Sequence, residues 1–98
     1  MPEEPPQISL ETRLRRSENI LFSEIDEDKV MIDIQRGAYF GLNPVAGEIW
    51  NLLETPHTPA ELVGALVNTY EVDEATCQTE TMDALQRMLK LGLVEIVA

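Results

Sequence analysis

Positive charge is scarce in this 98-residue chain, which has seven Lys and Arg against eighteen Asp and Glu and a formal net charge of −11. Binding to a nucleic-acid backbone depends on clustered Lys and Arg. The composition therefore argues against nucleic acid as a partner and favours neutral or basic partners. One cluster of bases, Arg13, Arg15 and Arg16, lies near the N-terminus. It could form a small anion-binding patch, although solvated side chains are the usual interpretation.

Cysteine and histidine are limited to one residue each, Cys77 and His57. A single cysteine cannot form an internal disulfide, which agrees with a reducing compartment. The two residues have no third group to orient them as nucleophile and base, and they are too few for a Cys/His zinc site. The five glycines are spread along the chain, so no phosphate-binding loop is present. The sequence thus predicts no enzyme, no catalytic residue, no metal site and no cofactor.

A hydrophobic run long enough to cross a bilayer is also missing. The N-terminal residues MPEEPPQ include acids and prolines, whereas a signal peptide needs basic and then apolar residues. The chain is therefore predicted to be cytoplasmic, with no membrane partner. Residues 1–17 are predicted to form a flexible N-terminal arm, because they begin with a Pro- and Glu-rich stretch that has little to bury. Residues 18–98 are predicted to form one domain around one core.

Apolar residues in the first half of the domain are typical of strands. Strands are predicted over residues 20–25, 29–35 and 38–42, bounded by polar or glycine-containing turns. The second turn contains Arg36-Gly37, where glycine is able to take positive φ. The three segments are close enough in sequence to form a three-stranded antiparallel meander.

The second half has helical spacing with clear start and stop signals. Asn43-Pro44 combines a favoured N-cap with proline at the first helical position. Thr58 and Glu61 have the spacing of a capping box. A third helix is predicted from Asp73, its cap, to about Leu91, with Gly92 ending it. Residues 93–97 are predicted to form a short strand or an extended tail, which gives an α+β chain with three strands followed by three helices.

The third predicted strand, Ala38-Tyr39-Phe40-Gly41-Leu42, lies at the edge of this meander and contains neither charge nor proline. Proteins usually protect such an edge, because its unpaired N–H and C=O groups can pair with another chain. Two interpretations remain open on physical grounds. Either the chain's own elements cover the edge, or the edge accepts a peptide strand.

Several segments in order resemble the PqqD-like family of precursor-peptide recognition elements. They extend over roughly residues 18–97 and comprise Tyr39-Phe40-Gly41-Leu42-Asn43, Ile49-Trp50-Asn51-Leu52-Leu53, Thr58-Pro59-Ala60-Glu61-Leu62, Tyr70-Glu71-Val72-Asp73 and Leu89-Lys90-Leu91-Gly92-Leu93-Val94. The resemblance implies a winged helix-turn-helix-like fold, in which a three-stranded antiparallel sheet precedes three helices. It also implies that residues 18–98 are a peptide-binding domain.

The resemblance further implies a role in the biosynthesis of ribosomally synthesised and post-translationally modified peptides (RiPPs). The leader region of a precursor peptide would add as a strand beside the third strand and against the third helix. The module would then deliver the precursor to a partner enzyme. That enzyme is a cysteine leader peptidase if the chain resembles the stand-alone lasso-peptide proteins, which is the interpretation favoured here, or a radical-SAM enzyme if it resembles the PQQ pathway.

Carried over to this sequence, the resemblance gives a set of candidate peptide-binding residues. The third strand supplies backbone pairing, and one face of the third helix supplies side chains that select the leader. The candidates are Ala38, Tyr39, Phe40, Gly41, Leu42, Asp83, Ala84, Arg87 and Leu91. Ile49, Trp50 and Leu53 are assigned to the core.

Two alternatives to peptide capture follow from the same fold. A winged helix can bind DNA through its third helix, although Glu74, Glu80 and Asp83 on that helix oppose this. The chain could also be a regulatory subunit without a peptide substrate, in which the edge of the third strand is an oligomer interface.

Overall fold

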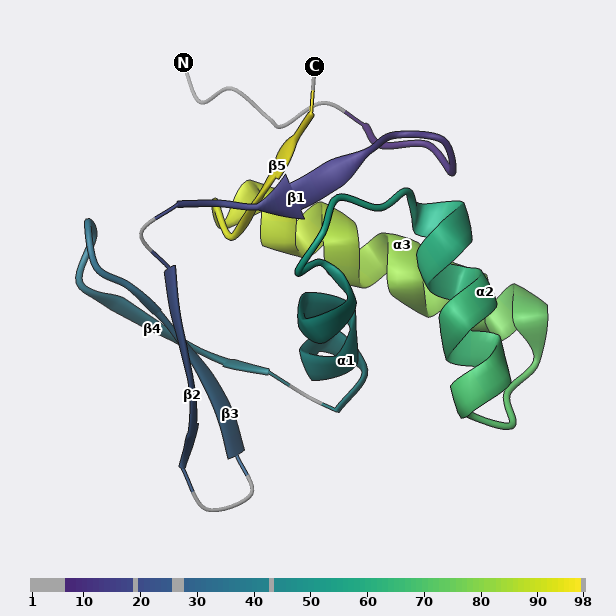
Figure 1. The fold of residues 1–98 in the computed structure, drawn as a ribbon, viewed down its shortest axis with the longest axis horizontal. Helices are drawn as coiled ribbons and strands as arrows, with labels where there is room; N and C mark the ends of the chain where they lie inside the picture. The colour runs from purple at the N-terminus through teal and green to yellow at the C-terminus, as the bar shows by residue number, and fades with distance from the viewer. Residues whose placement is uncertain (1–6, 19, 26–27, 43, 98) are drawn as a thin grey trace.

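Two small antiparallel sheets and three helices make up the structure, a computed structural model that describes residues 7–18, 20–25, 28–42 and 44–97 (Figure 1). The strands are β1 (Leu14–Arg16), β2 (Ile20–Ile25), β3 (Asp28–Asp33), β4 (Ala38–Leu42) and β5 (Val94–Ile96). The helices are α1 (Pro44–Leu52), α2 (Pro59–Thr69) and α3 (Glu74–Lys90). None of the described helices has the length and apolar character needed to cross a membrane.

The three-stranded sheet has the predicted antiparallel order β2-β3-β4. Its register places Met31 opposite both Phe22 and Phe40, so these three side chains share the face that packs on the core. Strand β3 ends at Asp33, two residues earlier than predicted. The carbonyl oxygen of Asp33 accepts a hydrogen bond from the N–H of Gly37 at 2.8 Å, which closes the turn, and Gly37 has the expected positive φ of 66°.

The predicted helix ends are also found. The Thr58 hydroxyl accepts a hydrogen bond from the N–H of Glu61, and the Glu61 carboxylate accepts one from the N–H of Thr58, which confirms the capping box of α2. The Asp73 carboxylate caps α3 by accepting from the N–H of Thr76 at 3.1 Å. The predicted cap of α1, Asn43, lies outside the described residues.

Helix α3 ends in a Schellman motif around Gly92, whose φ is 77°. The N–H of Gly92 donates to the carbonyl of Leu89 at 3.1 Å, and the N–H of Leu93 donates to the carbonyl of Met88 at 2.9 Å. Because this motif reverses the chain, Leu93 and Val94 return to the core and β5 runs back over α3.

The described part of the predicted arm, residues 7–17, differs from the expectation. Strand β1 lies in this segment and pairs with β5, with Leu14 opposite Ile96. Leu14 is 0% exposed, and its backbone also exchanges two hydrogen bonds with His57, at 2.9 and 3.0 Å. Strand β1 was not predicted, because a single leucine among three arginines is not a strand pattern. Its pairing partner lies about eighty residues away.

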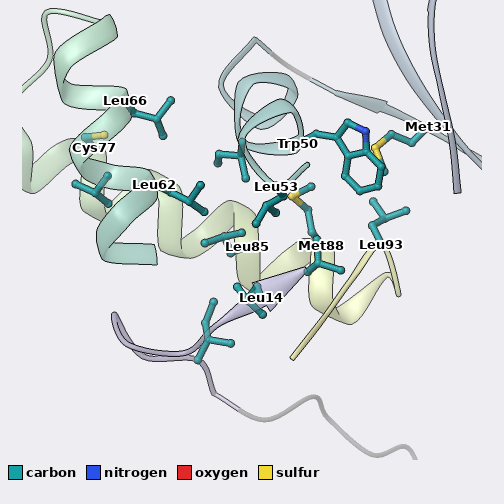
Figure 2. Packing of buried hydrophobic residues seen from close by; sticks show 14 residues of the cluster. Leu14, Met31, Trp50, Leu53, Leu62, Leu66, Cys77, Leu85, Met88 and Leu93 are labelled. Atoms are coloured by element: carbon teal, nitrogen blue, oxygen red, sulfur yellow. The ribbon is translucent and has the colours of Figure 1, made fainter. Parts of the chain in front are cut away.

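The core joins the sheet to the helices through Trp50 (Figure 2). Ile49, Trp50 and Leu53 are buried, as predicted, and Trp50 lies beside Met31 of the sheet and Leu93 after α3. The guanidinium of Arg16 lies 4.6 Å from the Trp50 ring centroid and donates two hydrogen bonds to the Trp50 carbonyl, at 2.6 and 3.0 Å. Partial burial lowers the pKa of Arg16, and the nearby Glu54 carboxylate opposes that shift.

Candidate functional site

Strand β4 has one paired edge and one open edge. It pairs with β3 on one side, and within the described chain no strand pairs with its other side. The segment has no charge and no proline to protect it. Its outer row of main-chain donors and acceptors is therefore available to an added strand.

An apolar groove with a volume of about 300 Å³ lies beside this edge, between β4 and the C-terminal half of α3. Its floor consists of three buried residues from different elements, Ala46, Met88 and Leu93. The remaining lining residues are half-buried or exposed: Tyr39, Phe40, Gly41, Ala84, Arg87 and Leu91. The floor is thus buried, whereas the walls are accessible from outside.

The helical wall of the groove follows one face of α3. Ala84, Arg87, Met88 and Leu91 are spaced by three or four residues, so they lie one above another on the helix surface. Ala84 contributes only a methyl group at the N-terminal end of this face. A small residue at this place leaves room for a side chain from a bound peptide.

The strand wall is formed by consecutive residues with different orientations. Phe40 shares the inner face with Met31, so its side chain packs toward the core. Tyr39 and Gly41 have the opposite orientation, and Tyr39 is 73% exposed. Tyr39 and Gly41 therefore border the groove along its backbone edge, where strand pairing would occur.

The structure brings six of the nine candidate site residues together around this groove. They are Tyr39, Phe40, Gly41, Ala84, Arg87 and Leu91. Ala38 and Leu42 lie at the two ends of β4, and their side chains are outside the described part of the structure. Asp83 lines a different hollow with Gln7 and Ile8, because it is rotated by about 100° from Ala84 around the helix.

Three lining residues were not among the candidates. Met88 is 3% exposed, so it belongs to the core, and it also forms part of the groove floor. Its spacing from Ala84 and Leu91 was the signal that could have identified it. Ala46 and Leu93 come from other elements, and no local pattern places them at the groove.

Charged groups lie at the rim of the groove rather than in it. Arg87 Nη2 is 3.6 Å from Asp83 Oδ2, and both side chains are more than two-thirds exposed. An exposed pair of this kind contributes little to stability. Arg87 is therefore able to exchange Asp83 for a carboxylate of a ligand at small cost.

The single cysteine and histidine occupy different environments. Cys77 is 6% exposed in the α2–α3 interface, with its sulfur 3.9 Å from the hydroxyl of Thr81. Nδ1 of His57 lies 2.8 Å from the carbonyl of Thr55 in the loop before α2. In the part of the chain that the structure describes, no group of three or more His, Cys, Asp and Glu is arranged to hold a metal ion.

The fold and the groove define a small α+β domain with an open sheet edge beside an apolar helix face. The family model for coenzyme PQQ synthesis protein D (PqqD) matches residues 28–94, which include β3, β4 and all three helices. The chain therefore belongs to the PqqD family, as the motifs indicated. Among curated proteins, none matches the chain.

Three solved structures are similar over most of the chain. TbiB1 in complex with the TbiA(beta) leader peptide is 34% identical, with a TM-score of 0.75 over 86% of this chain and 98% of that chain. Lasso peptide synthetase B1 complexed with a leader peptide is 24% identical, with a TM-score of 0.72 over 84% and 96%. The PqqD truncation of Methylobacterium extorquens PqqCD, a stand-alone RiPP recognition element, is 18% identical with a TM-score of 0.80 over 95% and 99%. The similarity to lasso peptide synthetase B1 and to the PqqD truncation shows that this chain shares their fold.

Proposed function

We propose that this chain is a non-catalytic adaptor that binds the leader region of a RiPP precursor peptide and presents it to a processing enzyme. The observation that carries the proposal is the open edge of β4 beside the apolar groove of α3. A peptide that adds to this edge obtains main-chain hydrogen bonds from β4, and its alternate side chains face the groove.

The candidate residues have distinct roles in this proposal. Residues 38–42 supply the backbone pairing, while Ala84 and Leu91 contact side chains of the leader above the floor of Met88 and Leu93. Arg87 contacts polar groups of the leader at the rim, where it exchanges its exposed pair with Asp83 for the ligand. Main-chain pairing with one or two apolar anchors gives an expected dissociation constant in the micromolar to nanomolar range, roughly −8 to −12 kcal/mol.

The comparison with TbiB1 supports the peptide class. That protein is 34% identical over most of this chain and is seen in complex with a leader peptide. We infer a leader peptidase of the cysteine protease type as the partner enzyme, from the resemblance to stand-alone lasso-peptide proteins. A radical-SAM enzyme is the alternative partner.

We also propose that the fold is a variant of the winged helix-turn-helix. In this variant α2 and α3 are the helix pair, and the sheet β2-β3-β4 is the wing. The chemistry belongs to the partner enzyme, because Cys77 is buried and His57 already has a neighbour in its own loop. The peptide-binding unit includes β1, since Leu14 completes the core under α3.

A titration with the leader peptide of the precursor encoded beside this chain's gene tests the proposal, with the TbiA(beta) leader as a comparison ligand. Peptides with a single N-methylated amide should lose affinity at every second position of the paired segment, because alternate N–H groups of an added strand point toward β4. Absence of saturable binding, or a loss that does not alternate, would contradict strand addition.

A further inference from the structure

The turn between β3 and β4 is built around the carboxylate of Asp33, whose side chain is 8% exposed. Asp33 Oδ1 accepts a hydrogen bond from the N–H of Arg36 at 3.1 Å, and its carbonyl accepts one from the N–H of Gly37. These bonds fix the turn immediately before β4. They also set the direction in which the Arg36 side chain leaves the hairpin.

Arg36 extends from this turn to the C-terminal end of α3. Its Nη1 donates to the carbonyl of Leu91 at 3.1 Å, and its Nε lies 3.6 Å from Asp33 Oδ2. A guanidinium at the C-terminus of a helix also interacts favourably with the helix dipole. One side chain thus connects the hairpin to the helix that faces it.

Gly92 leaves the space that the guanidinium occupies. A Cβ at Gly92 would lie 3.1 Å from Nη2 of Arg36 and 3.4 Å from Cζ and Nη1. The guanidinium therefore lies directly against the backbone that ends α3. The glycine that the Schellman motif needs for its positive φ also permits this contact.

The contact joins the two walls of the groove at one end. Arg36 precedes β4 by two residues, and Leu91 lines the groove from α3. The hairpin otherwise meets the rest of the molecule through side chains near Trp50, such as Met31 and Phe40. A bridge at the turn restricts rotation of the hairpin about that contact.

We propose that Arg36 is a positioning residue that sets the separation of β4 from α3 and so preorganises the peptide groove. The proposal rests on the proposed function, because the consequence is measured as leader affinity. Arg36 itself does not line the groove, and it is 63% exposed. The Asp33 carboxylate is buried, but in Arg36→Ala it keeps its hydrogen bond from the backbone N–H of residue 36, which limits the loss of stability. A preorganised site, in contrast, lowers the entropic cost of binding. Removal of Arg36 should therefore affect binding more than folding.

The matched comparison is Arg36→Ala against Arg15→Ala. Arg15 has a similar exposure of 55% and a similar pair with Glu95, with 2.6 Å between Nε and Oε1, but it connects β1 to β5 away from the groove. Arg36→Ala should weaken binding of the leader peptide about tenfold, the size expected for losing one charge-assisted bond that orders the site. Arg15→Ala should leave the affinity unchanged, and both melting temperatures should shift by only a few degrees.

Gly92→Ala provides an independent variant, since its methyl group displaces the guanidinium. Gly92→Ala should lower the affinity of the parent chain for the leader peptide. In a chain that already has Arg36→Ala, the same substitution should lower the affinity much less. If Gly92→Ala lowers the leader affinity equally in the parent chain and in Arg36→Ala, then Gly92 acts through its own backbone alone. That result would overturn the coupling between Gly92 and Arg36.

A measurement without peptide separates this inference from the proposed function. Spin labels at Leu21→Cys and Glu80→Cys, with Cys77→Ala, report the distance between the hairpin and α3. Arg36→Ala should broaden this distance distribution, and Arg15→Ala should not. If the distribution and the leader affinity are both unchanged in Arg36→Ala, the positioning role is wrong. If the distribution broadens but the parent chain binds no leader, the proposed function fails and the positioning contact stands.

Discussion

Leu14 shows how one side chain can decide whether a segment belongs to the fold. It is the only apolar residue in the stretch Arg13–Arg16, yet it is fully buried beneath α3, close to Leu85 (Figure 2). Burying a leucine completely contributes a large share of the stability of a domain of this size. The N-terminal segment is thus held by a core contact as well as by the pairing of β1 with β5.

Leu14→Ala should lower the free energy of unfolding by about 2–5 kcal/mol, the usual cost of a large cavity in a core. Leu21→Ala is the matched control, because Leu21 is 54% exposed on the outer face of the sheet, and it should change stability little. Chemical denaturation measures both. Similar stabilities for the two variants would show that residues 7–17 do not contribute to the core.

Ala84 is the residue at which the groove is most easily closed. Ala84→Leu places a larger side chain in the lining of the groove and should lower the affinity for the leader about tenfold or more, since the added atoms occupy the space of a peptide side chain. Ala75→Leu, at an exposed position of the same helix, is the control and should bind as the parent chain does. Unaltered binding by Ala84→Leu would mean that the peptide lies elsewhere.

At the scale of elements, local signals were enough to locate most helices and strands. The apolar residues of β2 and β4 and the caps Thr58 and Asp73 are signals that lie within a few positions of one another, so they can be recognised in the sequence. Strand β1 could not be predicted, because its pairing with β5 is a contact between the two ends of the chain.

Most of the candidate site, like most of the helices and strands, could be predicted from the sequence. The edge of β4 and the face of α3 follow from pattern and family resemblance, and six of the nine candidates meet at the groove. Ala46 and Leu93 could not be found, since they reach the groove only through the packing of α1 and the chain reversal at Gly92. Asp83 shows that a one-residue difference on a helix changes the face.

The capping box of α2 should make stability depend on acidic pH. Hydrogen bonds from the backbone and the hydroxyl of Thr58 hold the pKa of Glu61 below its ordinary value of 4.5. Because the folded-state pKa is depressed, this contribution is complete above pH 4.5 and is lost as the pH falls through the lower, folded-state pKa. Thermal unfolding of the parent chain and Glu61→Gln between pH 3 and pH 7 measures it.

The variant should be less stable than the parent chain near neutral pH, and the difference should shrink as the pH falls below about 4.5. Glu48→Gln, at a half-buried position of α1, is a suitable control for a change of charge. A constant difference across the pH range would show that the ionised form of Glu61 has no special role in the cap.

At the scale of the whole molecule, the net charge and the surface shape can be compared with the needs of each candidate partner. The net charge of −11 opposes approach to a polyanion such as DNA. The open edge and the apolar groove need only a peptide with main-chain groups and apolar side chains. The electrostatics and the groove therefore favour the same class of partner.

A gel-shift experiment with duplex DNA at low salt should show no tight complex. Added salt should make no difference, since few phosphate contacts form and few counterions are released. Tight binding that weakens steeply with salt would contradict the peptide-binding account and support the DNA-binding alternative.

The most direct test of the central claim is an NMR titration of the labelled chain with the leader peptide. The account predicts saturable binding, with amide shifts concentrated in β4 (Ala38–Leu42) and around Ala84, Arg87 and Leu91 of α3, and with cross-strand contacts between the peptide and β4. Shifts confined to α2 or to the β1–β5 ribbon, or no saturable binding at all, would contradict it.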